Sequence, residues 1–431
     1  MPVDQLNITE KNRSWLQWRT TLWLAVGGAV NYGDRSTLGS VLPAIQQDLA
    51  LSDVALGMIG AAFLWSYALA SPFAGWLSDR FPRKRLAIWS LALWSLVMLA
   101  TGLAQSLSSL FILRICLGLT ECIYIPAAFA LIASIHGSST RAKAYGLVVI
   151  AMTVGVIVGG TSSGFMAERF GWRSSFVVFG LLGIILVPLM KYFINEGVGL
   201  KESKMVKVTT TEVFKYLIRT PSYLIVLLKV MLAGVSLWIF SNWLPYYFKH
   251  SFKMDLGEAG FAGTFYLEFS AILGFAAGAW ISDKAAVRYA PRRMMLQSLA
   301  YCSAAPFMMV FLVHPNLILV NVCLFTFGFL RSAGDANEAS IVSEVIPSRY
   351  QGTAYALSNS CATAAGGVGV LLAGYYKPMF GLNAIFSASG VIFLCAGVGL
   401  WVGYRRFIKG DIARASTMNE VHQVQVKAIT L

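Results

Sequence analysis

Apolar segments of about 20 residues recur along the whole chain, and they constrain its fold more than any other feature. That length is what an α-helix needs to cross the hydrocarbon core of a bilayer. The chain is 57% hydrophobic and only 13% charged, whereas a soluble domain carries about 25% charged residues. Strands of a membrane β-barrel are about 10 residues long and alternate in polarity. The continuous runs therefore predict an all-α membrane protein.

We expect twelve membrane-spanning helices, and the longest polar stretch between them divides the chain into two halves of six. The predicted domains are an N-terminal six-helix bundle (1–195), a cytoplasmic linker (196–220) and a C-terminal six-helix bundle with a short cytoplasmic tail (221–431). The expected spans lie near residues 18–42, 54–78, 85–105, 107–135, 142–166, 174–194, 222–248, 257–282, 293–313, 316–345, 351–376 and 382–404.

The net charge of +14 is distributed as in a membrane protein, which argues against a nucleic-acid partner. Lys and Arg cluster in the loops that follow even-numbered spans, and few occur in the other loops. Such clusters mark the cytoplasmic side of a membrane. We therefore expect a multi-pass protein of the plasma (inner) membrane with both termini in the cytoplasm. The clusters are RFPRKR (80–85), STRAK (139–143), KESKMVK (201–207) and APRR (290–293).

The two halves echo each other weakly in sequence. GWLSDR (75–80) is echoed by AWISDK (279–284), and FGWRSSF (170–176) by FGLNAIF (380–386). The first pair is 204 residues apart (75 to 279) and the second 210 residues apart (170 to 380). Arg and Tyr also open both the fifth and the eleventh span, as Arg141 with Tyr145 and Arg349 with Tyr355. Similar spacings indicate a duplication that produced two parallel six-helix repeats.

GWLSDRFPRKR (75–85) resembles the signature of the major facilitator superfamily in the loop between spans two and three, with Pro82 in place of a usual glycine. The resemblance implies the major facilitator fold, in which two bundles rock about a central site. The residues of this loop are expected to support the gate and the topology without binding substrate. They are Gly75, Asp79, Arg80 and Arg83.

Nine ionisable residues lie well inside the predicted spans. A charge at the bilayer centre costs about 2.5–3.5 kcal/mol on insertion scales. These side chains must therefore face the bundle interior, pair with one another or line a wet cavity. They are Asp34, Arg35, Arg114, Glu121, Lys229, Glu268, Arg331, Asp335 and Glu338.

The charges of the first and fourth spans predict a switchable set of ion pairs. Arg114 and Glu121 are seven residues apart, hence on one helix face and about 10 Å apart along the axis. The simplest arrangement pairs Asp34 with Arg114 and leaves Arg35 near Glu121 or the cavity. Arginine stays protonated, so the acids would carry the proton. The arginines would hold an anionic substrate, because their forked donors match a carboxylate.

These residues also resemble the anion:cation symporter branch of the superfamily. The similar motifs are Asn-Tyr-x-Asp-Arg in the first span, Arg-x-x-x-Gly-x-x-Glu in the fourth and SNWLPYYF (241–248) in the seventh. The resemblance implies organic-anion transport coupled to protons. It assigns proton coupling to Asp34 and Glu121, and contact with the substrate to Arg35, Arg114, Tyr32 and Tyr67.

Spinster-like transporters have similar motifs in the first and fourth spans. A proton-coupled exporter of lipids, amphiphiles or drugs is therefore the alternative prediction. A wide apolar cavity would favour that alternative.

The second half departs from the sugar-acid pattern. Arg331, Asp335 and Glu338 lie on one face of the predicted tenth span, at i, i+4 and i+7, and Lys229 and Glu268 add charge from spans seven and eight. One interpretation is an internal set of salt bridges that fixes the C-terminal bundle. The other is a second group of cavity charges that recognises a zwitterionic or polar substrate.

Taken together, the sequence predicts a secondary active transporter that symports protons with a small organic anion, a sugar acid or another carboxylate, by alternating access. Asn359 is a candidate for substrate hydroxyls or for a helix–helix hydrogen bond. We expect a monomer without a cofactor. A metal site is not expected, because the four His are scattered along the chain. The sequence contains no nucleophile–base pattern that would predict an enzyme. A membrane receptor or sensor that kept the fold without transporting is a further alternative.

Overall fold

The structure is a computed structural model that describes residues 10–195, 210–287, 289–313 and 315–430. All regular elements within these ranges are helices. In chain order they are α1 (Glu10–Asp48), α2 (Asp53–Arg80), α3 (Arg83–Thr101), α4 (Leu107–Glu121), α5 (Tyr124–Ile135), α6 (Ser138–Phe170), α7 (Trp172–Phe193), α8 (Thr210–Ile218), α9 (Pro221–Ser251), α10 (Leu256–Ala286), α11 (Arg292–Ala304), η1 (Ala305–Val313), α12 (Leu317–Asp335), α13 (Glu338–Val345), η2 (Ser348–Tyr350), α14 (Gln351–Arg406) and α15 (Ile408–Thr430).

The predicted twelve spans are confirmed by these helices. Ten described segments are long and apolar enough to cross a membrane. One of them contains two spans, because α14 turns at Gly381, whose φ is 72°. The other missing span is α1, which is 39 residues long and carries Arg19, Asp34 and Arg35 within its apolar part. The ten segments, the second half of α14 and α1 together make twelve.

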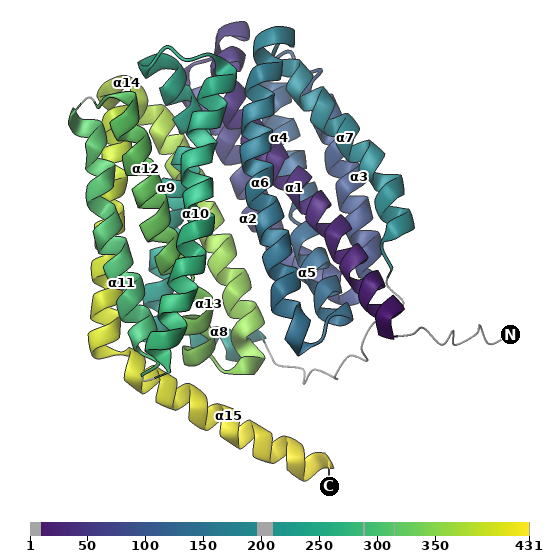
Figure 1. The fold of residues 1–431 in the computed structure, drawn as a ribbon, viewed down its shortest axis with the longest axis vertical. Coiled ribbons are helices and arrows are strands. Elements are labelled where there is room, and N and C mark those ends of the chain that lie inside the picture. The colour runs from purple at the N-terminus through teal and green to yellow at the C-terminus, as the bar shows by residue number, and fades with distance from the viewer. Residues whose placement is uncertain (1–9, 196–209, 288, 314, 431) are drawn as a thin grey trace, which may run out of the picture.

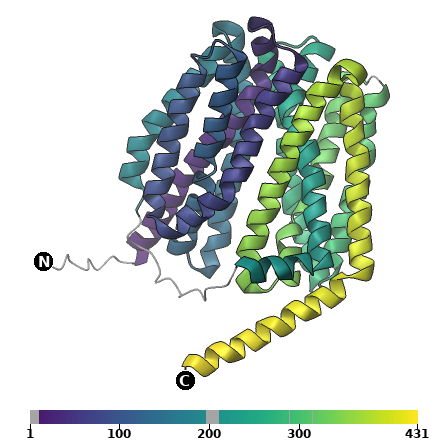
Figure 2. The same cartoon turned by 180° about the vertical axis from the view of Figure 1, so that it is seen from behind.

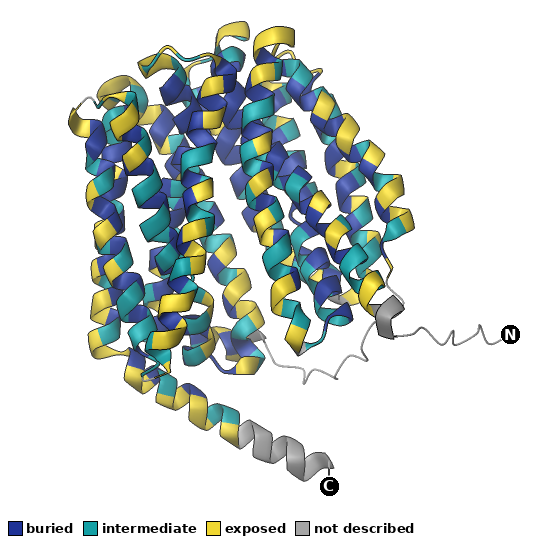
Figure 3. Cartoon of the chain, in the orientation of Figure 1, coloured by how far each residue is buried: buried dark blue, intermediate teal, exposed yellow. Residues whose placement is uncertain are grey.

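The helices form two bundles that lie side by side, α1 to α7 in one and α9 to α14 in the other (Figure 1). In both views the ribbons of the two bundles approach at the end opposite the chain termini and spread apart toward the termini (Figure 2). Exposed residues lie along the outward-facing sides of the helices (Figure 3). Many of these are large and apolar, such as Trp89, Val158 and Ile185, which is the surface that lipid requires.

The sequence echoes between the halves have structural equivalents. Gly171 separates α6 from α7 with a φ of 80°, and Gly381 divides α14 with a φ of 72°, so each Phe-Gly echo marks a tight turn that favours glycine. The Tyr145 hydroxyl donates to the Phe129 carbonyl, and the Tyr355 hydroxyl donates to the Ala339 carbonyl. Each tyrosine thereby ties its own helix to the preceding span in the same way.

Small residues bring the two bundles into close contact at the end opposite the termini. Between the bundles, α2 packs on α14 and α6 packs on α10. A Cβ atom added to Gly39 would overlap the Ser241 carbonyl, and one added to Gly164 would overlap the Leu256 carbonyl. Backbones that approach this closely need glycine, as small-residue motifs at helix interfaces do.

The short helix α8 and the tail helix α15 lie at the end that carries the termini (Figure 1). The carboxylate of Asp411 in α15 accepts a hydrogen bond from the Ser222 backbone N–H, 2.9 Å away, in the first turn of α9. The Tyr350 hydroxyl donates to Glu212 of α8 at 2.5 Å. These contacts tie both helices to the C-terminal bundle. Residues 196–209 of the predicted linker lie outside the described residues.

Candidate functional site

Two spans are interrupted near the middle of the molecule, and acidic side chains stand at both interruptions. The fourth span is divided into α4 and α5, and Glu121 is the last residue of α4. The tenth span is divided into α12 and α13, with Asp335 ending the first and Glu338 beginning the second. The residues at the interruptions, Cys122, Ile123, Ala336 and Asn337, keep right-handed helical dihedral angles, so each interruption is a local distortion within one span. The predicted spans 107–135 and 316–345 are each present as one apolar segment, Leu107–Ile135 and Leu317–Val345, and the sequence did not predict the distortions within them.

Arg35 of α1 forms the polar centre of the N-terminal bundle. Its Nε atom donates to Glu121 Oε2 at 2.8 Å, and its Nη2 atom donates to Asn31 Oδ1 at 3.0 Å. The guanidinium carbon lies 4.6 Å from the ring centroids of both Tyr32 and Tyr67. Glu121 is fully buried, so the pair stands in a place where either ion alone would be costly.

Asp34 and Arg114 do not form the direct ion pair that we predicted. Asp34 instead accepts a hydrogen bond from Trp94 Nε1 of α3 at 2.9 Å and is fully buried. Arg114 lies 5.3 Å from the Phe176 ring of α7 and is 2% exposed. The two side chains thus turn toward different neighbouring helices, which the spacing along a single helix does not reveal.

Lys229 of α9 is the centre of a second polar group, in the C-terminal bundle. Its ammonium lies 2.7 Å from Asp335 Oδ1 and 2.6 Å from Glu338 Oε2, and its side chain is only 2% exposed. Asp335 also accepts from the Tyr301 hydroxyl at 2.5 Å and from Arg331 Nη1 at 3.0 Å. The predicted salt-bridge set therefore exists in the structure, centred on Lys229.

A cavity of about 230 Å³ lies between these two groups and is lined by both bundles. Seven of the predicted residues line it: Tyr32, Arg35, Tyr67, Lys229, Asp335, Glu338 and Asn359. Four others, Asp34, Arg114, Glu121 and Arg331, do not line it. Glu121 and Arg331 contact the wall residues Arg35 and Asp335, whereas the partners of Asp34 and Arg114 are not on the wall.

Glu268 of α10 is half-buried and has no hydrogen bond or ion pair with any described residue. It lies within electrostatic range of Arg331 and Tyr32. The structure thus places it near the two polar groups and outside both.

Several residues of the site were not found from the sequence. Trp94 and Tyr301 donate hydrogen bonds to Asp34 and Asp335, while Trp238 and Thr363 line the cavity. A buried tryptophan or tyrosine normally has a polar partner. This tendency could have indicated that Trp94 and Tyr301 bond to polar groups. Nothing in the sequence distinguishes Trp238 from the other aromatic residues of the spans.

A second polar feature joins the bundles at the end opposite the termini. Lys377 of α14 lies 2.6 Å from Asp53 of α2, which also accepts from Gln46 at 2.8 Å. The Tyr246 hydroxyl of α9 donates to Gln46 at 2.7 Å. The Lys377 ammonium stands 3.7 Å from the Tyr246 ring, and the His250 ring stacks on that tyrosine at 4.0 Å.

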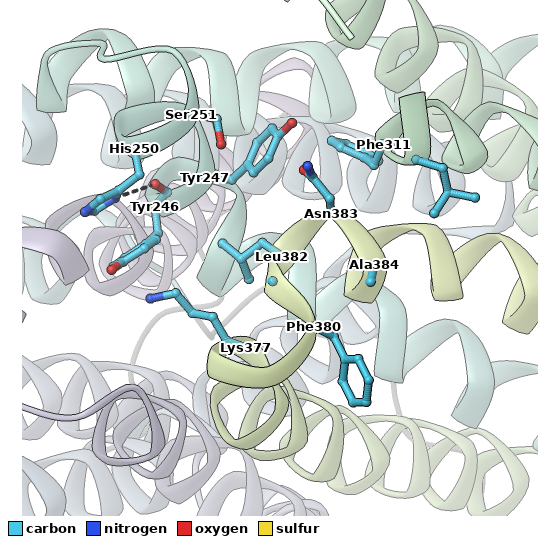
Figure 4. Close-up of a pocket in the computed structure, with 12 residues that line it drawn as sticks. Tyr246, Tyr247, His250, Ser251, Phe311, Lys377, Phe380, Leu382, Asn383 and Ala384 are labelled. Atoms are coloured by element: carbon cyan, nitrogen blue, oxygen red, sulfur yellow. Dashed lines mark hydrogen bonds between the residues drawn. The ribbon is translucent and has the colours of Figure 1, made fainter. Parts of the chain in front are cut away.

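Three of these residues, Tyr246, His250 and Lys377, line an open pocket of about 600 Å³ on the C-terminal bundle. Figure 4 shows Lys377 extending toward Tyr246, with Leu382 and Asn383 of α14 facing the same space.

The predicted gating residues lie at the junction of α2 and α3, at the end that carries the termini: Gly75, Asp79 and Arg80 are in the last turns of α2, and Arg83 begins α3. Gly75 has open space where a Cβ would stand. Arg80 is exposed and stacks on Trp76, with its guanidinium carbon 4.3 Å from the ring centroid. Arg83 donates to the Ala130 carbonyl of α5 at 3.3 Å. The side chain of Asp79 lies outside the described part of the structure.

Comparisons with known proteins agree with this architecture. A model of the Major Facilitator Superfamily matches residues 24–370 and 226–422. A probable galactarate/D-glucarate transporter of Bacillus subtilis (strain 168) is 26% identical over 429 residues, which cover 91% of each chain. The hexuronate transporter of the same bacterium is 25% identical over 407 residues, covering 91% of this chain and 95% of the relative.

Among solved structures, a bacterial homolog of the human lysosomal transporter Spinster, in an inward-facing and unoccupied conformation, superposes with a TM-score of 0.78. It covers 93% of this chain and 98% of its own, at 19% sequence identity. At that identity the similarity concerns the fold.

Proposed function

This chain belongs to the Major Facilitator Superfamily and is an integral, multi-pass membrane transporter, and from this premise we propose that it symports protons with a small organic anion. The anion would be a sugar acid or a related carboxylate, as the names of its relatives suggest. One observation carries the proposal most directly. A cavity-lining arginine, Arg35, is held by a buried carboxylate, Glu121, and stacked between two tyrosines.

Coupling would arise from competition for Arg35. While Glu121 is ionised, it occupies the Nε donor of Arg35. Protonation of Glu121 removes that charge and leaves the guanidinium available for a substrate carboxylate, which it can bind with two parallel hydrogen bonds. The loaded site is then close to neutral. Asp34, held by Trp94, is proposed as the second proton site, and Arg114 as the fixed charge behind the wall.

Alternating access would open and close the two ends of the molecule in turn, and in this structure the bundles touch at one end and are apart at the other (Figure 2). The polar contacts of Lys377, Asp53, Gln46 and Tyr246 join the bundles at one end. The bundles spread toward the end with the termini (Figure 2). With the termini in the cytoplasm, as the basic loops predict, this arrangement would be the inward-facing state.

Uptake into proteoliposomes tests the proposed function. An acidic exterior should drive accumulation of galacturonate, gluconate or another labelled carboxylate above its equilibrium level. A protonophore should abolish that accumulation without affecting protein integrity. If none of a panel of small carboxylates accumulates under an imposed pH gradient, the proposed function is wrong.

Glu121→Gln should separate exchange from proton coupling. The amide keeps the shape of the carboxylic acid and cannot release a proton, so Arg35 stays available to substrate. We expect counterflow of labelled against unlabelled anion to persist while pH-driven accumulation disappears. Glu258→Gln, at an exposed residue in the first turn of α10 that does not line the cavity, is a control that should keep its accumulation. Unchanged accumulation by the Glu121 variant would remove this residue from the mechanism.

Lys377→Met should favour separation of the two bundles at the end opposite the termini, where they are in contact. The change removes an ion pair that forms only while α14 lies against α2, so it shifts the equilibrium toward the open state. Ser40→Cys is a suitable reporter, because Ser40 is 1% exposed and lies beside Gly160 of α6 and Gly260 of α10, where the two bundles meet. In a background without the six native cysteines, external maleimide should label it several times faster with Lys377→Met. The exposed Lys253→Met is the matched control, and equal labelling rates in the two variants would contradict the assignment.

One observation favours the alternative of an amphiphile exporter. An apolar groove of about 380 Å³ runs between α9 and α14, lined by Val235, Leu372 and Ile392 among others. A proteoliposome assay of a fluorescent lysolipid or a cationic dye distinguishes the alternatives. Transport of the probe without competition from any carboxylate would select the exporter.

A further inference from the structure

The two walls of the central cavity carry opposite charge. Arg35 presents a guanidinium from the N-terminal bundle, and Glu338 presents a carboxylate from the C-terminal bundle. A molecule in this cavity therefore meets a cation on one side and an anion on the other. This asymmetry bears on which organic anions the cavity accepts.

Lys229, on the wall formed by the C-terminal bundle, is already paired with carboxylates of its own bundle. It is 2% exposed, and both Asp335 and Glu338 already hold its ammonium. Asp335 in turn has three donors, Lys229, Tyr301 and Arg331. Two of the three ammonium donors of Lys229 are thus used within this group, and its charge is balanced by the carboxylates that it contacts.

Glu338 is the exception within this group. Only its Oε2 atom contacts Lys229, and Oε1 has no hydrogen-bond partner among the described residues. Its side chain is 30% exposed. It shares the cavity wall with the Trp238 ring and the Asn359 side chain. A carboxylate beside an aromatic ring is the environment that an ammonium group prefers.

Building on the proposed function, we infer that the transported anion is a zwitterionic monocarboxylate, such as an amino sugar acid. Its carboxylate would pair with Arg35 and its ammonium group with Glu338. A dicarboxylate would place its second carboxylate against Glu338, and the resulting like-charge repulsion would exclude it. The chain would thus differ from the relatives named for galactarate and D-glucarate, which are dicarboxylates.

Three acids with one carbon skeleton test this inference in proteoliposomes. Glucosaminate is the zwitterion, gluconate lacks the amino group, and glucarate carries a second carboxylate. We expect kcat/KM for glucosaminate to exceed that for gluconate by about tenfold or more, with no measurable accumulation of glucarate. Accumulation of gluconate or glucarate in preference to glucosaminate would overturn the inference and leave the proposed function standing. Accumulation of no carboxylate at all would instead overturn the proposed function.

Glu338→Gln assigns the selectivity to a single side chain. The variant should bring glucosaminate to within about threefold of gluconate and should admit glucarate, because an amide neither attracts ammonium nor repels carboxylate. Lys229 keeps Asp335 as its partner in this variant, so the fold is preserved. Glu338→Asp should retain the preference for glucosaminate. A preference that survives Glu338→Gln would show that Glu338 is not its source.

Glu344→Gln is the matched control, on the same helix α13. Its carboxylate lies 3.2 Å from Arg293 and does not line the cavity. The preference for glucosaminate should be unchanged in this variant. Loss of the preference here would mean that the general charge of α13 is responsible, and would overturn the assignment to Glu338.

Discussion

We expect the Arg35→Ala variant to lose anion uptake by about 100-fold or more. Truncating one member of a buried, hydrogen-bonded charge pair costs about 2–5 kcal/mol, and each 1.4 kcal/mol corresponds to a factor of about ten. Two cations line the cavity, Arg35 and Lys229. Because Lys229 is paired with two carboxylates, the variant removes the cation that we propose binds the substrate. Initial rates of uptake, normalised to the amount of monodisperse reconstituted protein, measure the effect.

Arg35→Lys should fail nearly as badly as Arg35→Ala. A lysine ammonium lacks the planar fork that bonds Glu121 and Asn31 at once while lying between two tyrosine rings. Arg19→Ala is the control on the same helix, because Arg19 stacks on Trp15 and Phe193 outside the cavity. Uptake by Arg35→Lys at the rate of the unmodified protein would show that only the charge matters at this position.

The Lys229→Met variant should be destabilised by about 1.5–3 kcal/mol, the range for losing a hydrogen bond to a charged group, because the carboxylates left behind are 23% and 30% exposed. Asp335 keeps Arg331 and Tyr301 as partners, but Glu338 is left without a cation. Methionine fills much of the same volume, so the loss is mainly electrostatic. A clear drop in the thermal unfolding temperature of the purified protein in detergent is the expected result.

A second substitution should restore much of this loss. Combining Lys229→Met with Glu338→Gln removes the unpaired carboxylate, and replacing a whole buried ion pair is often nearly neutral. Lys284→Met, at an exposed lysine that stacks on Trp280, should change stability by no more than about 0.5 kcal/mol. If Lys229→Met unfolds at the temperature of the unmodified protein, the ion pairs of Lys229 do not stabilise the fold.

The sequence predicted the architecture well, because hydrocarbon imposes a simple rule on each span. Apolar runs of sufficient length predicted twelve helices in two bundles. The Phe-Gly echoes at 170–171 and 380–381 correspond to turns in which the glycine has a positive φ. Each of these features depends on local chemistry that a single stretch of sequence carries.

Side-chain partners were predicted less well, because they depend on how helices turn about their axes. The expected pair of Asp34 with Arg114 is absent. Arg35, which was expected near Glu121 or the cavity, bonds Glu121 and also lines the cavity. Helical periodicity states which residues share a face but does not state which helix that face meets. The sequence therefore did not predict Trp94 as the hydrogen-bond partner of Asp34.

The break in the tenth span was also beyond prediction, since no proline marks it. Asn337 stands at the break, and its side-chain amide donates to the carbonyls of Ala333 and Gly334, each at 3.2 Å. That amide satisfies groups that a continuous helix would bond through its backbone. Asp335 and Glu338 consequently stand on two helices and still converge on Lys229.

The bond from Asp411 to the Ser222 backbone N–H has a practical consequence for anyone who shortens or tags this protein. Helix α9 has no side-chain cap of its own, and this carboxylate supplies one to its first turn. A truncation at Arg406 would remove what resembles a dispensable tail and would also uncap the helix that carries Lys229. Affinity tags and fluorescent fusions therefore belong beyond α15, with the whole helix retained.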